Sequence, residues 1–160
     1  MIIPPQPLHP SFKLNGLQFN SLDEIRSLAY DLYSEDESYE QSIGKFILLW
    51  LNADDTIELE TSGSTGDSKK VMIRKEHMAN SALATGNYFL QGEDTSALLC
   101  LSASYIAGKM MLIRSMVLGL SMDLVSPNSN PMEDNKKKYD FAAMTPMQAF
   151  NSMSKLNLVE

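Results

Sequence analysis

Residues 58–77, ELETSGSTGDSKKVMIRKEH, place a cluster of glycine and hydroxyl side chains between two segments that have the alternating pattern of β-strands. Ile57 and Leu59 alternate with polar residues before the cluster, and Val71 and Ile73 alternate with polar residues after it. Because two strand signals flank a short glycine-containing loop, this stretch predicts a β-hairpin.

The segments around this hairpin predict an α/β fold with a mainly parallel sheet flanked by helices, because strand and helix patterns alternate along the chain. Strand patterns cover residues 56–61, 69–74, 96–102, 121–125 and 139–145. Helical patterns cover residues 21–33, 38–51, 75–90, 107–119 and 146–156. We therefore divide the chain into a helical N-terminal lead, residues 1–55, and an α/β segment, residues 56–160.

Composition excludes several classes of function. The net charge of −7 and the pI near 4.8 argue against binding of a nucleic-acid backbone over a broad surface. Lys109 and Arg114 interrupt the longest apolar stretch, so we expect no membrane insertion. Cys100 is the single cysteine and lies in the apolar run ALLCL, which favours a buried small side chain over a nucleophile. A reducing, cytoplasmic environment fits this cysteine content.

The glycine and hydroxyl cluster has the chemistry of a phosphate-binding loop. Glycine permits tight or left-handed backbone, so that amide groups can converge on an anion, and hydroxyls and a lysine add further donors. A turn rich in small residues, without a ligand, is the alternative. The P-loop pattern does not fit, because Ser68 and Lys70 occupy its second glycine and its hydroxyl position. The dinucleotide pattern does not fit either, because the loop leads into a strand.

The segment TSGSTGDSKKV resembles the phosphate-loop signature [ST]-S-G-[ST]-T-G-x-P-K-G of the adenylate-forming superfamily, which includes acyl- and aryl-CoA ligases. Ser68 stands where that family has proline, and Lys70 stands where it often has glycine; loss of the proline leaves the loop less preorganised. The matching positions, which the resemblance implies bind the phosphates of ATP, are Thr61, Ser62, Gly63, Ser64, Thr65, Gly66 and Lys69.

Later segments follow the family in the same order. His77 lies about eight residues after the loop lysine, where the family often has histidine, and TPMQ at residues 145–148 is similar to its VPTQ segment. The segment YIAGKMMLIRSMVLG is similar to a segment of o-succinylbenzoate–CoA ligase of menaquinone biosynthesis. The matching positions there are Ile106, Gly108, Arg114 and Gly119.

The resemblance implies the N-terminal part of the large domain of an adenylate-forming enzyme. Its substrates would be a small-molecule carboxylate, ATP with Mg²⁺, and coenzyme A. The catalytic residues and the Mg²⁺ ligands are expected beyond Glu160, so the 160 residues alone are expected to be inactive. Tyr105 and Lys109 are candidates for the acyl-substrate pocket; a core tyrosine and a lysine that extends to solvent are the alternatives.

Other functions stay open from the sequence. A fatty- or aryl-acid CoA ligase fits the same loop, and so does a non-catalytic nucleotide-binding module. The sequence indicates no particular oligomeric state.

Overall fold

The computed structural model describes residues 7–35, 38–61 and 69–159, with Thr61 described in its backbone alone. The helices are α1 (Leu22–Ser34), α2 (Tyr39–Trp50), α3 (Lys75–Phe89), α4 (Ile106–Leu118), α5 (Pro146–Asn151) and the 3₁₀ helix η1 (Met153–Leu158). The strands are β1 (Lys13–Leu14), β2 (Leu17–Gln18), β3 (Thr56–Thr61), β4 (Lys69–Arg74), β5 (Ser96–Leu99), β6 (Ser121–Leu124) and β7 (Phe141–Ala143).

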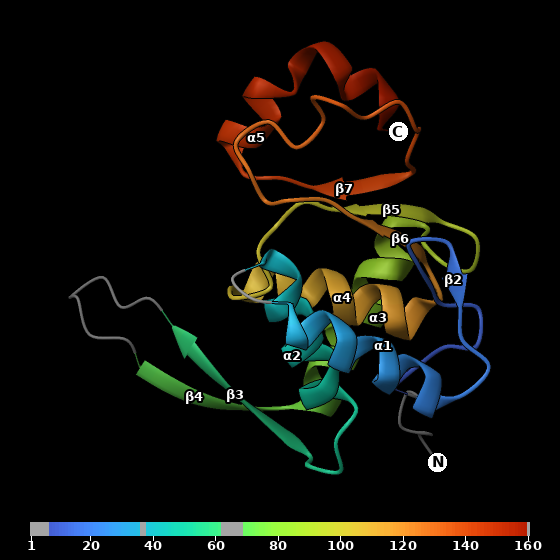
Figure 1. Cartoon of the computed structure of the whole chain (residues 1–160), viewed down its shortest axis with the longest axis vertical. Helices are drawn as coiled ribbons and strands as arrows, with labels where there is room; N and C mark the ends of the chain where they lie inside the picture. The colour runs from blue at the N-terminus through green and yellow to red at the C-terminus, as the bar shows by residue number, and fades with distance from the viewer. Residues whose placement is uncertain (1–6, 36–37, 62–68, 160) are drawn as a thin grey trace.

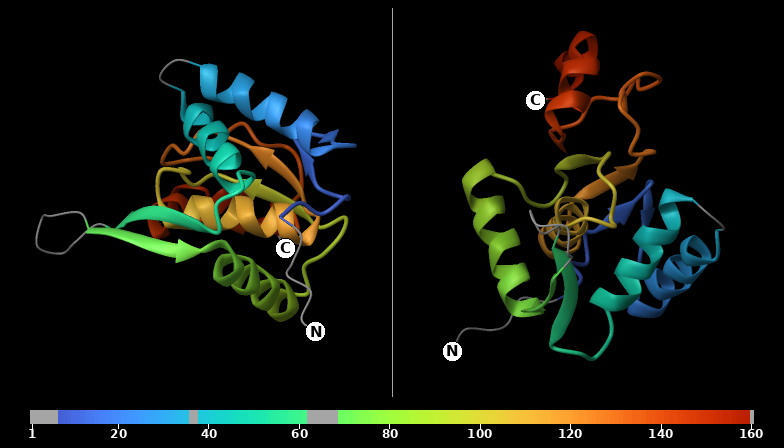
Figure 2. Two further views of the ribbon diagram at one scale, coloured as in Figure 1. Left: turned by 90° about the horizontal axis from the view of Figure 1, so that it is seen from below. Right: turned by 90° about the vertical axis from the view of Figure 1, so that its left-hand side faces the viewer.

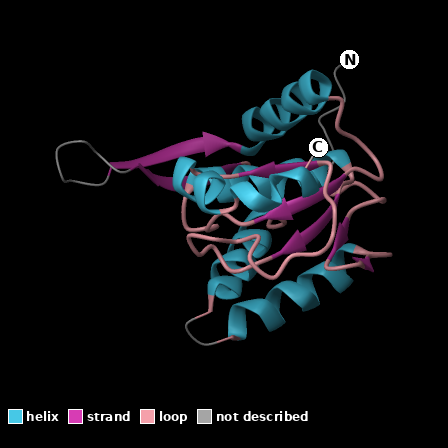
Figure 3. Ribbon diagram, turned by 90° about the horizontal axis from the view of Figure 1, so that it is seen from above, coloured by secondary structure: helices cyan, strands magenta, loops and turns pink. Residues whose placement is uncertain are grey.

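The main sheet has five strands in the order β2-β1-β6-β5-β7, and it is mainly parallel, as the sequence predicts. β5 pairs in parallel with β6 on one side and with β7 on the other, and β1 pairs in parallel with β6. β1 and β2 form an antiparallel pair at one edge. β3 and β4 form a separate antiparallel hairpin, which projects away from the helices (Figure 3).

Helices α1 to α4 gather on one side of the main sheet (Figure 1). The buried helix α4 lies in the middle, with α3 on one side and the α1–α2 pair on the other (Figure 2, right). Its apolar residues pack with the side chains of Ala97 and Leu99 from β5. The alternate side chains of that strand, Leu98 and Cys100, belong to a second apolar cluster on the opposite face. The sheet is therefore covered on both faces, as expected for parallel strands.

Local sequence signals account for the ends of several helices. The side chains of Ser21 and Ser38 accept hydrogen bonds from the third backbone N–H of α1 and α2, and so both residues cap their helices. The apolar stripe of α2 is buried throughout and consists of Ile43, Phe46, Ile47, Trp50 and Leu51. Gly119 ends α4 in the left-handed conformation, with φ of 77°, which glycine adopts without strain.

The structure adds two strands to the first 55 residues. β1 and β2 are joined by Asn15 and Gly16, with φ of 49° and 80°. Asn-Gly with two positive φ angles is the typical two-residue hairpin turn, so the sequence contains a local signal for this hairpin. β1 then pairs with β6, and the N-terminal segment becomes part of the main sheet as well as of its helical cover.

Helix α3 buries a face that differs in part from the one that its larger apolar residues indicate. Helical spacing places Met78, Ala82, Leu83 and Phe89 along one side. Met78 and Ala82 are buried, but Leu83 and Phe89 are 37% and 56% exposed. Ala79 and Gly86 fill the contact instead. Small residues suit this contact because α3 packs closely against α4: a Cβ built on Gly86 would lie 2.7 Å from a methyl group of Leu118.

Asp140 links the beginnings of β5 and β7 through Ser96. The backbone N–H and the hydroxyl of Ser96 both donate to Asp140 Oδ2 at 2.7 Å. These bonds, led by that from the hydroxyl, hold the pKa of Asp140 below its ordinary value of 3.8. Because the folded-state pKa is lowered, the charged carboxylate stabilises the fold above the unfolded-state pKa, and this contribution is lost as the pH falls through the folded-state pKa.

We therefore expect Asp140→Asn to lower the melting temperature most near neutral pH. The difference from the wild type should shrink as the pH falls below the ordinary pKa of 3.8, because the unfolded chain then takes up a proton that the folded carboxylate, with its lowered pKa, still resists. Thermal unfolding followed by circular dichroism between pH 3 and pH 7 measures this difference, with the exposed Asp134→Asn as the control. A difference that stays constant over the range would contradict the role of the charged form.

Candidate functional site

The strand order reverses at β5, and this creates a crevice at the carboxyl end of the sheet. The chain leaves β5 through α4, which packs on one face, and enters β6 on one side of β5. The connection from β6 to β7 contributes Met132 and Tyr139 to the cluster on the other face. In open α/β sheets, ligands bind where neighbouring connections diverge to opposite faces in this way. The topology alone therefore marks the carboxyl ends of the neighbouring strands β5 and β6 as a binding position.

A cavity of about 420 Å³ occupies this position, and we call it the switch-point cavity. Three separate segments line it: the turn from β5 into α4, the first part of the β6–β7 connection, and the turn from β7 into α5. Its lining residues are Cys100, Leu101, Ser102, Tyr105, Ala107, Pro127, Asn128, Ser129, Thr145, Met147 and Gln148. None of these described lining residues is charged. The cavity therefore suits a ligand group that is largely apolar, with hydroxyl and amide groups around it.

Cys100 lies at the end of β5 in the wall of this cavity, but it is fully buried. Its thiol donates to the backbone oxygen of Ala143 at 3.2 Å. Burial raises the pKa of Cys100 to about 11, so the reactive thiolate is suppressed at neutral pH. The expectation of a buried side chain is confirmed.

The β3–β4 hairpin predicted around the glycine cluster is present. Its strands pair from Thr56 opposite Arg74 to Thr61 opposite Lys69. On β3 the apolar side chains of Ile57 and Leu59 are buried, and across the strands Lys70 Nζ lies 2.8 Å from Glu58 Oε1.

The hairpin points toward the same end of the molecule at which α4 and α5 begin (Figure 1). Glu60, one residue before the end of β3, acts electrostatically on Lys109 in the first turns of α4. The ends of the hairpin strands are thus near the turn that lines the cavity.

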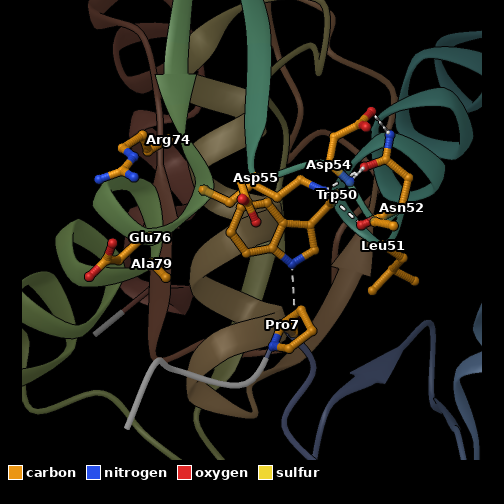
Figure 4. Close-up of a pocket in the computed structure, with 11 residues that line it drawn as sticks. Pro7, Trp50, Leu51, Asn52, Asp54, Asp55, Arg74, Glu76 and Ala79 are labelled. Atoms are coloured by element: carbon orange, nitrogen blue, oxygen red, sulfur yellow. Dashed lines mark hydrogen bonds between the residues drawn. The ribbon is translucent and has the colours of Figure 1, made fainter. Parts of the chain in front are cut away.

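A second cavity, of about 380 Å³, lies at the base of the hairpin and was not anticipated from the sequence (Figure 4). Trp50, which lines it, donates from Nε1 to the backbone oxygen of Pro7 at 2.8 Å. Lys75, also in the lining, donates from Nζ to the side-chain and backbone oxygens of Asn52, at 2.6 and 3.0 Å. These bonds join the start of α3 to the end of α2, and so they fix the hairpin to the body.

Comparisons with known proteins show a similarity to solved structures. No protein-family model matches the chain, and no curated protein matches it. Among solved structures, the chain is similar to the AMP-forming acyl-CoA synthetase/AMP-acid ligase II-like protein from Dyadobacter fermentans, with a TM-score of 0.71 and 33% sequence identity. The similarity covers 83% of this chain and 38% of that protein. The chain resembles part of an adenylate-forming enzyme domain.

The similarity supports a ligase-type enzyme family and agrees with the fold expected from the sequence. The chain spans well under half of the length of the protein from Dyadobacter fermentans.

The predicted phosphate-binding residues of the adenylate-forming signature are only partly within the described chain. Ser62, Gly63, Ser64, Thr65 and Gly66 lie outside the described residues, and the side chain of Thr61 does as well. Lys69 is described, and it is the first residue of β4 with an exposed side chain. Phosphate binding by these residues stays a prediction.

The two predicted acyl-pocket residues lie in different surroundings. Tyr105 is the N-cap of α4, lines the switch-point cavity and is 70% exposed, so it is not a core tyrosine. Lys109 is not among the described lining residues of that cavity; it donates from Nζ to the backbone oxygen of Ser104 at 3.1 Å. Burial lowers the pKa of Lys109, while Glu60 raises it and Lys45 lowers it.

Of the described lining residues, Tyr105 alone was predicted as a pocket residue, and the polar residues that were not predicted include Asn128, Ser129 and Gln148. The first two belong to a polar stretch that reads as a turn. For Gln148 the sequence does contain a signal, because Thr145 and Gln148 have the T-x-x-Q spacing of a capping box. Both bonds of that box are present at the start of α5.

Within residues 7–35, 38–61 and 69–159, no group of three or more histidine, cysteine, aspartate or glutamate side chains could hold a metal ion. In the same part of the chain, no helix has the length and apolar character needed to cross a membrane.

Proposed function

We propose that this chain is part of an ATP-dependent acyl-CoA ligase. The observation that carries the proposal is the position of the switch-point cavity: it lies at the same end of the fold as the hairpin strands that flank the phosphate-loop signature. The structural similarity to an AMP-forming acyl-CoA synthetase supports the same assignment.

In the proposed reaction, a carboxylate oxygen of the substrate attacks the α-phosphorus of ATP. A new oxygen–phosphorus bond forms, the bond from the α-phosphorus to the bridging oxygen breaks, and pyrophosphate leaves with the electron pair. The thiolate of coenzyme A then attacks the acyl carbonyl and expels AMP. Both steps require charge neutralisation and alignment, which hydroxyls, amides and lysine can provide.

The residues of this chain have defined parts in that proposal. The signature residues from Thr61 to Gly66, with Lys69, hold the β- and γ-phosphates and stabilise the departing pyrophosphate. The switch-point cavity receives the acyl group, with Tyr105 at its mouth. Mg²⁺ supplies further charge neutralisation, and we expect its ligands and the catalytic residues outside the described part of this chain.

The decisive experiment is carboxylate-dependent exchange of labelled pyrophosphate into ATP, measured with the full natural protein that contains these 160 residues. Exchange that depends on a carboxylic acid supports the ligase. ATP binding without exchange, for every acid tested, would overturn it and favour a non-catalytic nucleotide-binding module.

Within the ligase class, we propose o-succinylbenzoate, an intermediate of menaquinone biosynthesis, as the substrate. The proposal rests on the similarity of residues 105–119 to that ligase family. Exchange with fatty or other aromatic acids in place of o-succinylbenzoate would retain the ligase and replace this substrate.

The second carboxylate of o-succinylbenzoate requires a cation, and Lys109 is the candidate. Since no described lining residue of the switch-point cavity is charged, the cation must come from outside this lining. Lys109 is a candidate because its Nζ donates to Ser104, which precedes the lining residue Tyr105. We expect Lys109→Met to raise the KM for o-succinylbenzoate about tenfold, because a hydrogen bond between charged groups is lost. The exposed Lys136→Met is the control, and an unchanged KM in the Lys109 variant would exclude the role.

A further inference from the structure

We propose that Gln148 is a positioning residue that sets the shape of the switch-point cavity. It does so by fixing three segments of the chain that are far apart in the sequence. The link from cavity shape to acyl binding rests on the proposed ligase function, whereas the link from Gln148 to cavity shape does not.

The side-chain amide of Gln148 bonds to all three walls of the cavity. Nε2 donates to the backbone oxygen of Cys100 at the end of β5, at 2.7 Å, and to the backbone oxygen of Asn128 at 2.9 Å. Oε1 accepts from the backbone N–H of Thr145 in the turn after β7, at 3.0 Å. One side chain thus holds together the ends of two neighbouring strands and the connection between β6 and β7.

These bonds make Gln148 a part of the wall rather than a ligand contact. Both hydrogens of its amide nitrogen are used by backbone oxygens, and its oxygen is used by Thr145. The residue is only 5% exposed. No donor is left for a substrate, so any effect on substrate binding must act through the segments that Gln148 holds.

The β6–β7 connection depends on α5 for its position. Asn151 donates from Nδ2 to the backbone oxygen of Ser129 at 3.0 Å, and Ser152 donates from Oγ to Asn130 Oδ1 at 3.3 Å. Both of these bonds hold the connection next to Asn128, but neither reaches β5. At its start, the connection is also joined to β5 by the bond from the backbone N–H of Val125 to the backbone oxygen of Leu99 at 3.1 Å. For the lining segment at Asn128, the described link to the end of β5 is the bridge through Gln148 to Cys100.

Replacement of Gln148 by glutamate keeps the shape of the side chain and removes the donors. Its carboxylate would face the backbone oxygens of Cys100 and Asn128, which repel it and lose their partner. Gln148→Met removes the same donors without adding charge. Both variants should let the Asn128 segment move away from β5 and open the cavity.

Cys100 reports this opening directly, because it is the single cysteine and is buried in the cavity wall. We expect a small uncharged thiol reagent to label Cys100 about tenfold faster in Gln148→Glu and Gln148→Met than in the wild type. Asn151→Asp is the matched comparison: it removes one bond to the same connection, at Ser129, but leaves the bridge from Gln148 to β5 intact. This variant should label more slowly than both Gln148 variants.

Steady-state exchange kinetics of the full natural protein give the second readout. Both Gln148 variants should raise the KM for the carboxylic acid about tenfold, with little change in kcat and in the KM for ATP. A role in general stability alone would instead lower the amount of active protein and leave each KM unchanged. Urea unfolding of every variant separates local opening from global unfolding as the source of faster labelling.

The labelling and exchange experiments test the role of Gln148 and the ligase proposal separately. Labelling at the wild-type rate in both Gln148 variants overturns the positioning role, and so does labelling that follows the loss of global stability. Faster labelling beyond that loss supports the role, even if the wild-type protein shows no exchange. Absence of exchange with every acid refutes the ligase proposal alone, because the labelling experiment needs no substrate.

Discussion

We expect Lys69→Ala in the full natural protein to lower the rate of pyrophosphate exchange about 100-fold. Lys69 occupies the lysine position of the phosphate-loop signature and begins β4, directly opposite the end of β3. A donor that stabilises charge developing on a leaving group contributes about this much to the rate. Exchange measured at saturating ATP and acid gives the effect on the chemical step.

Lys70 provides a matched control for that experiment. It is the next residue of β4, it is also exposed, and its ammonium is paired with Glu58 across the hairpin at 2.8 Å. Lys70→Ala should change exchange by no more than about threefold, because an exposed ion pair contributes little to stability. Equal losses in the two variants would assign the effect to the hairpin as a whole, and unchanged exchange in Lys69→Ala would exclude its role with the phosphates.

The contrast between these neighbours follows from the alternation of a strand. Successive side chains of β4 point to opposite faces, so Lys70 shares a face with Glu58, and Lys69 does not. Two adjacent lysines in the sequence therefore have different surroundings once the hairpin forms. The resemblance to the phosphate-loop signature selects the first of the two.

Features that depend on neighbouring residues were predictable from the sequence. The β3–β4 hairpin follows from alternating apolar residues around a glycine-containing loop, and the buried stripe of α2 follows from helical spacing. The end of α4 follows from Gly119. Each of these depends on a few consecutive residues, and so tertiary contacts only reinforce the local preference.

Features that depend on distant segments were not predictable in the same way. The cavity is formed by residues near positions 100, 128 and 148, which only the strand order brings together. Leu83 and Phe89 have the spacing of a buried face, yet close packing against α4 is made by Ala79 and Gly86 instead. The surroundings of Lys109 also depend on the position of α2, because Lys45 of that helix acts electrostatically on it. Residue spacing alone does not give this position.

Gly108→Ala should destabilise the protein strongly, because the first turn of α4 lies against the backbone that precedes it. A Cβ built on Gly108 would overlap the backbone oxygen of Ser102, lie 2.5 Å from the carbonyl carbon of that residue and lie 2.9 Å from the backbone nitrogen of Ala103. Backbone atoms cannot move aside as a flexible side chain can, so we expect a loss of about 2–3 kcal/mol in the free energy of unfolding. Urea denaturation measures this loss.

Gly92→Ala is the control, since a Cβ at that position would meet no atom within 4 Å. It should change the free energy of unfolding by less than about 0.5 kcal/mol. The displaced turn in Gly108→Ala includes Ser102, which lines the cavity, so faster thiol labelling of Cys100 should accompany the loss of stability. Equal stabilities of the two variants would show that α4 can shift away from the turn, and the close approach would then not explain why glycine occupies position 108.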